Sequence, residues 1–229
     1  MAIVASSQPS FLQSLRAGDR DDLLALGRAG RWERGEFLVR AGDPADSAIV
    51  LQSGLVKIHK ASGEGEEVVL GISGPGDLMG EVVAVRDAAR SASATALESV
   101  QGAQIPVAAL RSFLAAHGEA SLALLDLTLS RLYVSDQRRL EFATSGALAR
   151  VASRLVELTE RFGAPRGDGA VVEVGLPINQ EELASWSASS RESTARALRT
   201  LRELGLIQTS RLRLVVLDLP RLRDHAPRL

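Results

Sequence analysis

Two arginines and a glutamate stand close together in the segment Ser190-Arg191-Glu192-Ser193-Thr194-Ala195-Arg196. At about 100° per residue, a helix over 190–204 places these three side chains on one half and Ala197, Leu198, Leu201 and Leu204 on the other. Arginine suits the O6 and N7 acceptors of guanine in the DNA major groove, and glutamate can accept from the amino group of cytosine. The segment therefore predicts either a base-reading helix or a solvated face that carries salt bridges.

The chain around this segment has the pattern of a winged helix-turn-helix. Residues 177–184 begin a helix, with Asn179 as its N-cap and Glu182 three residues later, a pairing that satisfies free amides at a helix start. A short turn then leads to 190–204. The flanking elements are a helix over 147–162, a loop over 163–169, a strand over 171–174, and apolar runs at 206–209 and 212–217 that can pair as a hairpin. In this arrangement the charged face is free to contact DNA.

Short apolar runs separated by glycine, proline and aspartate fill the first half of the chain. Such spacing predicts an antiparallel barrel or sandwich. The expected strands are 36–39, 47–51, 55–59, 67–72, 93–96 and 102–105. A helix over 11–29 is expected before them, with Leu15, Leu23, Leu24 and Leu26 as its buried face.

A long helix is predicted from Glu119 to Thr144. Its leucines recur in steps of three and four, which is typical of a narrow seam between two chains. The seam residues are Leu122, Leu125, Leu129 and Leu132. We therefore expect a homodimer. Asp136 falls at the next seam position beside Ser135, where it either sets the register, marks the end of the seam or has another role.

The expected fold is thus α+β with three parts: a β-barrel domain with flanking helices at 1–118, a dimerisation helix and hinge at 119–144, and a winged helix-turn-helix domain at 145–229. Net charge is −1, but residues 147–229 hold 13 arginines against 10 acidic residues, so this part is the one suited to phosphates. We expect a cytoplasmic protein without a membrane partner, because no apolar run approaches the roughly 18 residues of a membrane span.

Three segments in the same order resemble bacterial transcription regulators of the CRP/FNR (cyclic-AMP receptor protein and fumarate–nitrate regulator) family. They are Gly80-Glu81-Val82 followed by Arg90-Ser91-Ala92, the helix 119–144, and Ser190-Arg191-Glu192-Ser193 with Arg196. The resemblance runs from about Leu15 to Leu217. It implies a cyclic-nucleotide-binding β-barrel of the jelly-roll type, a dimerisation helix and a DNA-binding domain.

The resemblance also implies an effector site that takes a cyclic nucleotide, cyclic AMP (cAMP) or cyclic GMP (cGMP). Its residues would be Gly80, Glu81, Val82, Arg90, Ser91, Ser135 and Asp136. A guanidinium fork and a hydroxyl suit a cyclic phosphodiester, and a carboxylate at Glu81 would accept from the ribose 2′-hydroxyl. The alternative is an internal Glu81–Arg90 ion pair without ligand. A carboxylate at Asp136 matches the N1–H and N2 amino group of guanine better than adenine, which favours weaker selectivity for cAMP or a shift toward cGMP.

For the DNA-binding part, the resemblance implies that Ser190, Arg191, Glu192 and Arg196 read a TGTGA-type half-site and that Arg199, Arg211 and Arg213 contact phosphate. Ala188 stands where the family usually has the turn glycine, so a left-handed backbone there would carry strain. RNA polymerase contacts in the family involve the loop aligned with about 163–170.

Other functions have less support in the sequence. The chain has no GxxxxGK[ST], HExxH or GxSxG motif, so we expect no enzyme and no obligatory cofactor. The absence of cysteine excludes thiolate metal sites and the Cys ligands of the oxygen-sensing branch, and His59, His117 and His225 are too scattered to suggest haem. The main alternative is a regulator of the same family that needs no nucleotide or senses a different ligand. A barrel acting only through protein partners would leave the arginine face unexplained.

Overall fold

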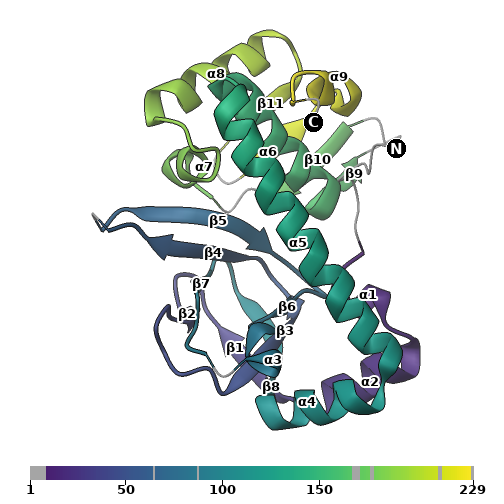
Figure 1. Cartoon of the computed structure of the whole chain (residues 1–229). Coiled ribbons are helices and arrows are strands. Elements are labelled where there is room, and N and C mark those ends of the chain that lie inside the picture. The colour runs from purple at the N-terminus through teal and green to yellow at the C-terminus, as the bar shows by residue number, and fades with distance from the viewer. Residues whose placement is uncertain are drawn as a thin grey trace. The chain divides into compact units, whose positions relative to one another are not determined.

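A computed structural model describes residues 9–63, 65–86, 88–166, 171–175, 178–210 and 213–227. The chain divides into two compact units, one extending to Leu132 and the other beginning at Tyr133. The order of the elements along the chain can be followed in Figure 1. We describe each unit by itself.

The first unit contains two antiparallel sheets of four strands each, with orders β1-β8-β3-β6 and β2-β7-β4-β5. A buried core that includes Trp32, Ile49 and Val56 draws on strands of both sheets, as in a sandwich. The strands are β1 (Arg28–Trp32), β2 (Phe37–Val39), β3 (Ser47–Ser53), β4 (Val56–Ala61), β5 (Glu67–Ser73), β6 (Leu78–Met79), β7 (Ser93–Ala96) and β8 (Val100–Pro106).

The helices of this unit pack around a second buried core. They are α1 (Phe11–Ser14), α2 (Ala17–Ala25), α3 (Val82–Val85), α4 (Val107–Ala116) and the first part of α5 (Gly118–Thr144). Phe11, Leu23, Leu110 and Leu124 are buried together with Val50 of β3 in this core. The helices therefore pack on the sandwich through apolar side chains. The short helix α3, which follows β6, packs against β3 and α4.

The six predicted strands are confirmed, but the predicted helix over 11–29 is wrong in two respects. The chain breaks at Leu15 and Arg16 into α1 and α2, and the residues after Gly27 form β1. Leu15 and Leu23 are buried as expected, whereas Leu26 is 40% exposed at the end of α2. Strand β1 has no alternation of apolar residues, and its five register pairs with β8 determine its conformation.

The second unit continues α5 and adds helices around a small antiparallel sheet of order β11-β12-β10-β9. Its elements are α6 (Ala147–Phe162), β9 (Ala164–Arg166), β10 (Val171–Gly175), α7 (Gln180–Trp186), α8 (Arg191–Glu203), β11 (Ile207–Ser210), β12 (Arg213–Val216) and α9 (Leu219–Asp224). Helix 147–162 and the two strands of the hairpin are confirmed. The expected loop after residue 162 starts instead with β9, which pairs with β10.

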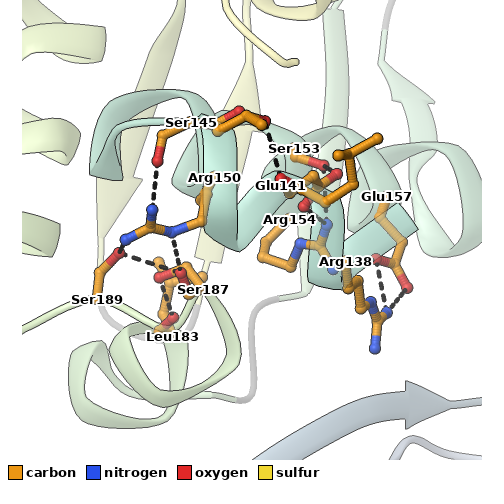
Figure 2. Close-up of polar contacts among 12 residues, drawn as sticks. Arg138, Glu141, Ser145, Arg150, Ser153, Arg154, Glu157, Leu183, Ser187 and Ser189 are labelled. Carbon is orange, nitrogen blue, oxygen red and sulfur yellow. Dashed lines mark hydrogen bonds and ion pairs between the residues drawn. The ribbon is translucent and has the colours of Figure 1, made fainter. Parts of the chain in front are cut away.

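A network of charges joins the end of α5 to α6 (Figure 2). Arg154 donates to Glu141 at 2.6 Å, and the Ser153 hydroxyl donates to the same carboxylate at 2.9 Å. Arg138 donates to both oxygens of Glu157, at 2.9 and 3.0 Å. Because Glu141 and Arg154 are buried, the last two turns of α5 are a packed part of the second unit. None of the helices over the described ranges is both long enough and apolar enough to span a bilayer.

Candidate effector and nucleic-acid sites

Helix α8 presents a charged face and packs on its opposite side. Ser190 is its N-cap, because its Oγ accepts from the Ser193 amide at 3.1 Å. Thr194, Ala197, Leu198 and Leu201 are buried, while Arg191, Glu192, Arg196 and Arg199 are exposed. The amphipathic pattern is thus confirmed, except that Leu204 is 40% exposed where the helix ends.

Carboxylates pair with two arginines of this face. Arg191 forms an ion pair with Glu181 of α7, and Arg196 Nη2 donates to Glu192 Oε1 at 2.7 Å, one helical turn away. These side chains are all mostly exposed, and exposed pairs of this kind contribute only about 0–1 kcal/mol to stability. Either partner of these pairs can therefore be exchanged for another polar group at a small cost in free energy, while the pairs orient the guanidinium groups.

Arg213, in strand β12 of the wing, also pairs with a carboxylate. Arg213 Nε lies 2.8 Å from Glu173 Oε1 on the neighbouring strand β10, and Arg166 of β9 lies 3.7 Å from the same carboxylate. Arg211, the other arginine expected to contact phosphate, lies outside the described residues, as do residues 167–170 of the loop expected to contact polymerase.

Two features predicted around the turn that precedes α8 are present: the capping box at the start of α7 and a left-handed Ala188 in the turn itself. Asn179 Oδ1 accepts from the Glu182 amide at 2.9 Å while Glu182 Oε2 accepts from the Asn179 amide at 2.8 Å, which confirms the capping box of α7. Ala188 has a φ of 46°, so it occupies the left-handed region that usually needs glycine. The short turn between α7 and α8 therefore has helix-turn-helix geometry with a strained alanine.

In the first unit, Gly80 and Arg90 lie against each other. Gly80 has a φ of 76°, and a Cβ atom added to it would collide with Nη1 of Arg90. The Arg90 side chain is only 6% exposed, its Nη2 lies 3.4 Å from the Ser47 hydroxyl, and the nearby Asp46 carboxylate is 3.9 Å away. The pKa of Arg90 is lowered by burial of the guanidinium, and the Asp46 and Asp43 carboxylates offset only part of this effect. The result is a buried cation with weak partners.

Glu81 pairs with Arg131 of α5 rather than with Arg90. Nη1 of Arg131 donates to the Glu81 carboxylate, and its Nη2 donates to the Leu78 carbonyl at 2.7 Å. Sequence reasoning missed Arg131, because its partners lie 50 and 53 positions away along the chain. It also missed Arg111 of α4, which donates to the Val83 and Ala84 carbonyls at 3.0 and 2.9 Å and so fixes the end of α3.

The remaining expected effector residues are exposed. Val82 opens α3 and Ser91 follows Arg90, and both are accessible to solvent. Ser135 and Asp136 lie beyond Tyr133 in the second unit, where the Asp136 carboxylate accepts from Arg139 at 3.1 Å. The structure thus places Gly80 against Arg90 and pairs Glu81 with Arg131.

The leucine seam of α5 lies on the surface of the single chain. Leu122, Leu125, Leu129 and Leu132 are 60, 54, 55 and 58% exposed. Leucine side chains at seam spacing, all more than half exposed, form the kind of apolar surface that marks a protein–protein contact.

Comparison with known protein families matches both units. Residues 30–117 match the cyclic nucleotide-binding domain, and residues 149–225 match the Crp-like helix-turn-helix domain. A CRP-like cAMP-activated global transcriptional regulator of Mycobacterium tuberculosis is 31% identical over 193 residues, which cover 84% of this chain and 85% of that protein. An anaerobic regulatory protein of Bacillus subtilis is 26% identical over 203 residues, covering 88% of this chain and 84% of that protein.

The fold has solved counterparts. The structure of FixK2 from Bradyrhizobium japonicum superposes with a TM-score of 0.77 at 18% identity and covers 89% of this chain and 98% of its own.

An effector domain built on a β-sandwich, joined by a long helix to a helix-turn-helix with a wing, defines a DNA-binding regulator of transcription and not an enzyme. The chain belongs to the CRP/FNR family of transcription regulators.

Proposed function

We propose that this regulator is a homodimer that reads a TGTGA-like palindrome under the control of a cyclic nucleotide. The observation that carries the proposal is the Arg90 guanidinium, which is buried against Gly80 and has the Asp46 carboxylate no nearer than 3.9 Å. Among the described residues no carboxylate lies closer to this guanidinium than Asp46. A buried cation in such surroundings is strongly stabilised by an anion that provides charge-assisted hydrogen bonds. A cyclic phosphodiester is such an anion.

The residues around Arg90 supply the rest of the ligand contacts. The Ser91 hydroxyl and the backbone at Gly80 and Val82 donate to phosphate oxygens, and Glu81 accepts from the ribose 2′-hydroxyl. Because Glu81 is bound to Arg131 in the free chain, the nucleotide exchanges or shares this partner. Ligand binding at Glu81 is thereby connected to α5.

The base of the nucleotide meets Ser135 and Asp136 on α5. A carboxylate accepts two parallel hydrogen bonds from guanine but only one from the adenine amino group. The protein therefore binds cGMP as well as cAMP, or prefers cGMP.

The dimer places two recognition helices on one face of DNA. Two chains pair through the leucine seam of α5, and their α8 helices enter successive major grooves about 34 Å apart. Arg191 and Arg196 contact guanines, Glu192 contacts cytosine, and Arg199, Arg211 and Arg213 contact phosphates. The nucleotide acts by binding more tightly to the arrangement of the two α8 helices that fits DNA.

Titration of a fluorescent TGTGA palindrome, followed by anisotropy, tests this proposal. We expect saturating cAMP or cGMP to tighten DNA binding. We expect Arg90→Gln to abolish that response and to leave the DNA affinity without nucleotide unchanged. The control is Arg86→Gln, which removes an exposed arginine of the same segment. DNA affinity that is equal with and without both nucleotides would contradict cyclic-nucleotide control.

One observation favours a second candidate, a regulator that needs no nucleotide or answers to a different ligand. The Arg131–Glu81 pair satisfies in the free chain the carboxylate that would bind ribose. The similarity to the anaerobic regulatory protein of Bacillus subtilis supports this candidate as well. Tight binding to the palindrome without added nucleotide, in protein shown by mass analysis to be ligand-free, would favour it.

A further inference from the structure

The guanidinium group of Arg150 in α6 binds four acceptors from two parts of the second unit (Figure 2). Its Nε donates to the Ser187 carbonyl at 2.8 Å, and its Nη2 donates to the Ala188 carbonyl at 2.9 Å and the Ser189 hydroxyl at 3.2 Å. Its Nη1 donates to the Ser145 carbonyl between α5 and α6. One side chain therefore connects the end of the long helix to the turn between α7 and α8.

The turn that Arg150 contacts contains the left-handed Ala188. The amide of Ala188 donates to the Ser185 carbonyl at 3.1 Å, and the amide of Ser189 donates to the Ala184 carbonyl at 2.9 Å. This pair of bonds ends a helix at a left-handed residue, which is glycine in most proteins. A Cβ atom disfavours the left-handed conformation by a factor of about 5–30. Ala188 therefore needs outside contacts to remain in it.

Arg150 provides these contacts at the position where a cation is most favourable. The carbonyls of Ser187 and Ala188 follow the C-terminal end of α7, where the helix dipole attracts positive charge. Helix α7 has no basic residue in its own last turn, so the charge comes from α6. Because Ser190, two residues after Ala188, is the N-cap of α8, the backbone of the turn decides the direction in which α8 begins.

We infer that Arg150 is the positioning residue of the recognition helix: it stabilises the left-handed turn at Ala188 and thereby sets the orientation of α8 relative to α7. The inference deepens the proposed DNA-reading role of α8 and rests on it. Arg150 acts through the turn and does not contact DNA itself. Its role depends on alanine at position 188, because glycine would adopt the same conformation unaided.

Four variants form a cycle that tests this dependence: Arg150→Gln, Ala188→Gly, the double variant, and the unchanged chain. The first readout is hydrogen exchange of the Ala188 and Ser189 amides in DNA-free protein. We expect Arg150→Gln to accelerate exchange at these amides, and the double variant to restore slow exchange. Equal exchange in Arg150→Gln and the unchanged chain would overturn the inference.

The second readout is the affinity for the TGTGA palindrome at several salt concentrations. We expect Arg150→Gln to bind at least about fivefold more weakly, as the loss of hydrogen bonds from a charged donor implies, with recovery in the double variant. Since no phosphate contact is lost, the slope of log affinity against log salt should stay the same. A slope reduced by about 0.9, the value of one phosphate contact, without recovery by Ala188→Gly would show that Arg150 binds DNA directly and would overturn the inference.

Two further variants make the experiment decisive. Arg221→Gln removes an exposed arginine from α9 and should change neither readout. Where Arg150→Gln does not fold, Arg150→Lys keeps the charge but cannot reach four acceptors, so it should show the same defects and the same recovery. If the unchanged protein does not bind the palindrome, the proposed function fails, and the exchange readout alone decides whether Arg150 holds the turn.

Discussion

Arg191 and Arg196 show how ion pairs orient single side chains on the charged face of α8. Arg191 is paired with Glu181 of the neighbouring helix α7, and Arg196 with Glu192 of its own helix. The pairs restrict long side chains that would otherwise move freely, so less conformational entropy would be lost if a base edge replaced the carboxylate, as we propose. At the same time each pair is exposed enough to be exchanged.

We expect Arg191→Ala to reduce discrimination at one guanine of each half-site by about 1–3 kcal/mol, because a bidentate contact to guanine is lost. Anisotropy titrations with the palindrome and with single-base variants measure the effect. The melting temperature should change little, since the side chain is exposed. Arg221→Ala is the matched control. An equal loss of affinity for all sequences would show that Arg191 contacts only phosphate.

Asp136 makes a separate prediction about the effector. We expect Asp136→Ser to lower the affinity for cGMP relative to cAMP by about 1.5–3 kcal/mol, the value of hydrogen bonds to a charged group. Calorimetric titrations with both nucleotides measure the ratio, and Asp126→Ser changes an exposed acidic residue of the same helix as a control. Comparable affinities for both nucleotides that stay unchanged in Asp136→Ser would remove the basis for base recognition by Asp136.

At the scale of elements, the long helix α5 serves two units with different chemistry. Its first part carries the exposed leucine seam, whereas its last two turns are held to α6 by the Glu141–Arg154 and Arg138–Glu157 contacts. The ring of Trp186 in α7 lies 5.8 and 5.7 Å from the guanidinium carbons of Arg138 and Arg154, which extends the network to the helix-turn-helix. The end of α5 is therefore part of the packing that supports α7.

This network makes the stability of the second unit dependent on pH. Burial acts to raise the pKa of Glu157, but Arg138, Arg154 and Arg161 outweigh it, and the pKa is lowered from its usual value of 4.5. A carboxyl with a lower pKa in the folded state stabilises the protein above its usual pKa, and this stabilisation is lost as the pH falls through the lowered value.

We expect Glu157→Gln to destabilise the protein by about 1.5–3 kcal/mol near pH 7, because two hydrogen bonds from Arg138 lose their charged acceptor. The difference from the unchanged chain should shrink as the pH falls below about 4.5. Chemical denaturation at pH values from 7 to about 3.5 measures both effects. Glu203→Gln, an exposed residue of α8, serves as the control. A difference that does not depend on pH would contradict the assignment.

At the scale of the whole molecule, net charge cannot explain DNA binding. The chain has a formal net charge of −1, so its affinity depends on where the arginines lie and on how many are used at once. A dimer doubles these contacts, and binding of its second subunit to the second half-site becomes an intramolecular step. In the proposed dimer, the leucine seam is therefore as important for DNA binding as helix α8.

We expect Leu125→Glu combined with Leu129→Glu to give a monomer in light scattering, because both leucines are more than half exposed in the single chain and face a partner in the proposed dimer. Affinity for the full palindrome should fall by about 10²–10⁴-fold, while a single half-site is bound as before. Leu26→Glu, at another exposed leucine, is the control. A double variant that remains dimeric would place the dimer contact elsewhere.

Features that depend on neighbours in the chain could be predicted from the sequence. Helix 147–162 and the capping box at Asn179 were both predicted, because capping and helical periodicity connect residues only three or four positions apart. Six of the eight strands of the first unit were predicted for a similar reason, from turn residues and apolar runs. Strand β1 was missed because it forms by pairing with β8, from Arg28 with Gln104 to Trp32 with Val100, far along the chain.

The sequence by itself therefore determined most of the elements, their order along the chain, the charged and apolar faces of α8, and the leucine seam of α5. Only the tertiary structure decided which side chains meet: Glu81 with Arg131, and Arg150 with the turn at Ser187 and Ala188. The reason is physical. A helix face or a cap is set by bonds along a few residues, whereas the partner of a charged side chain is set by which elements pack together, and a long arginine can reach any acceptor that packing brings within range.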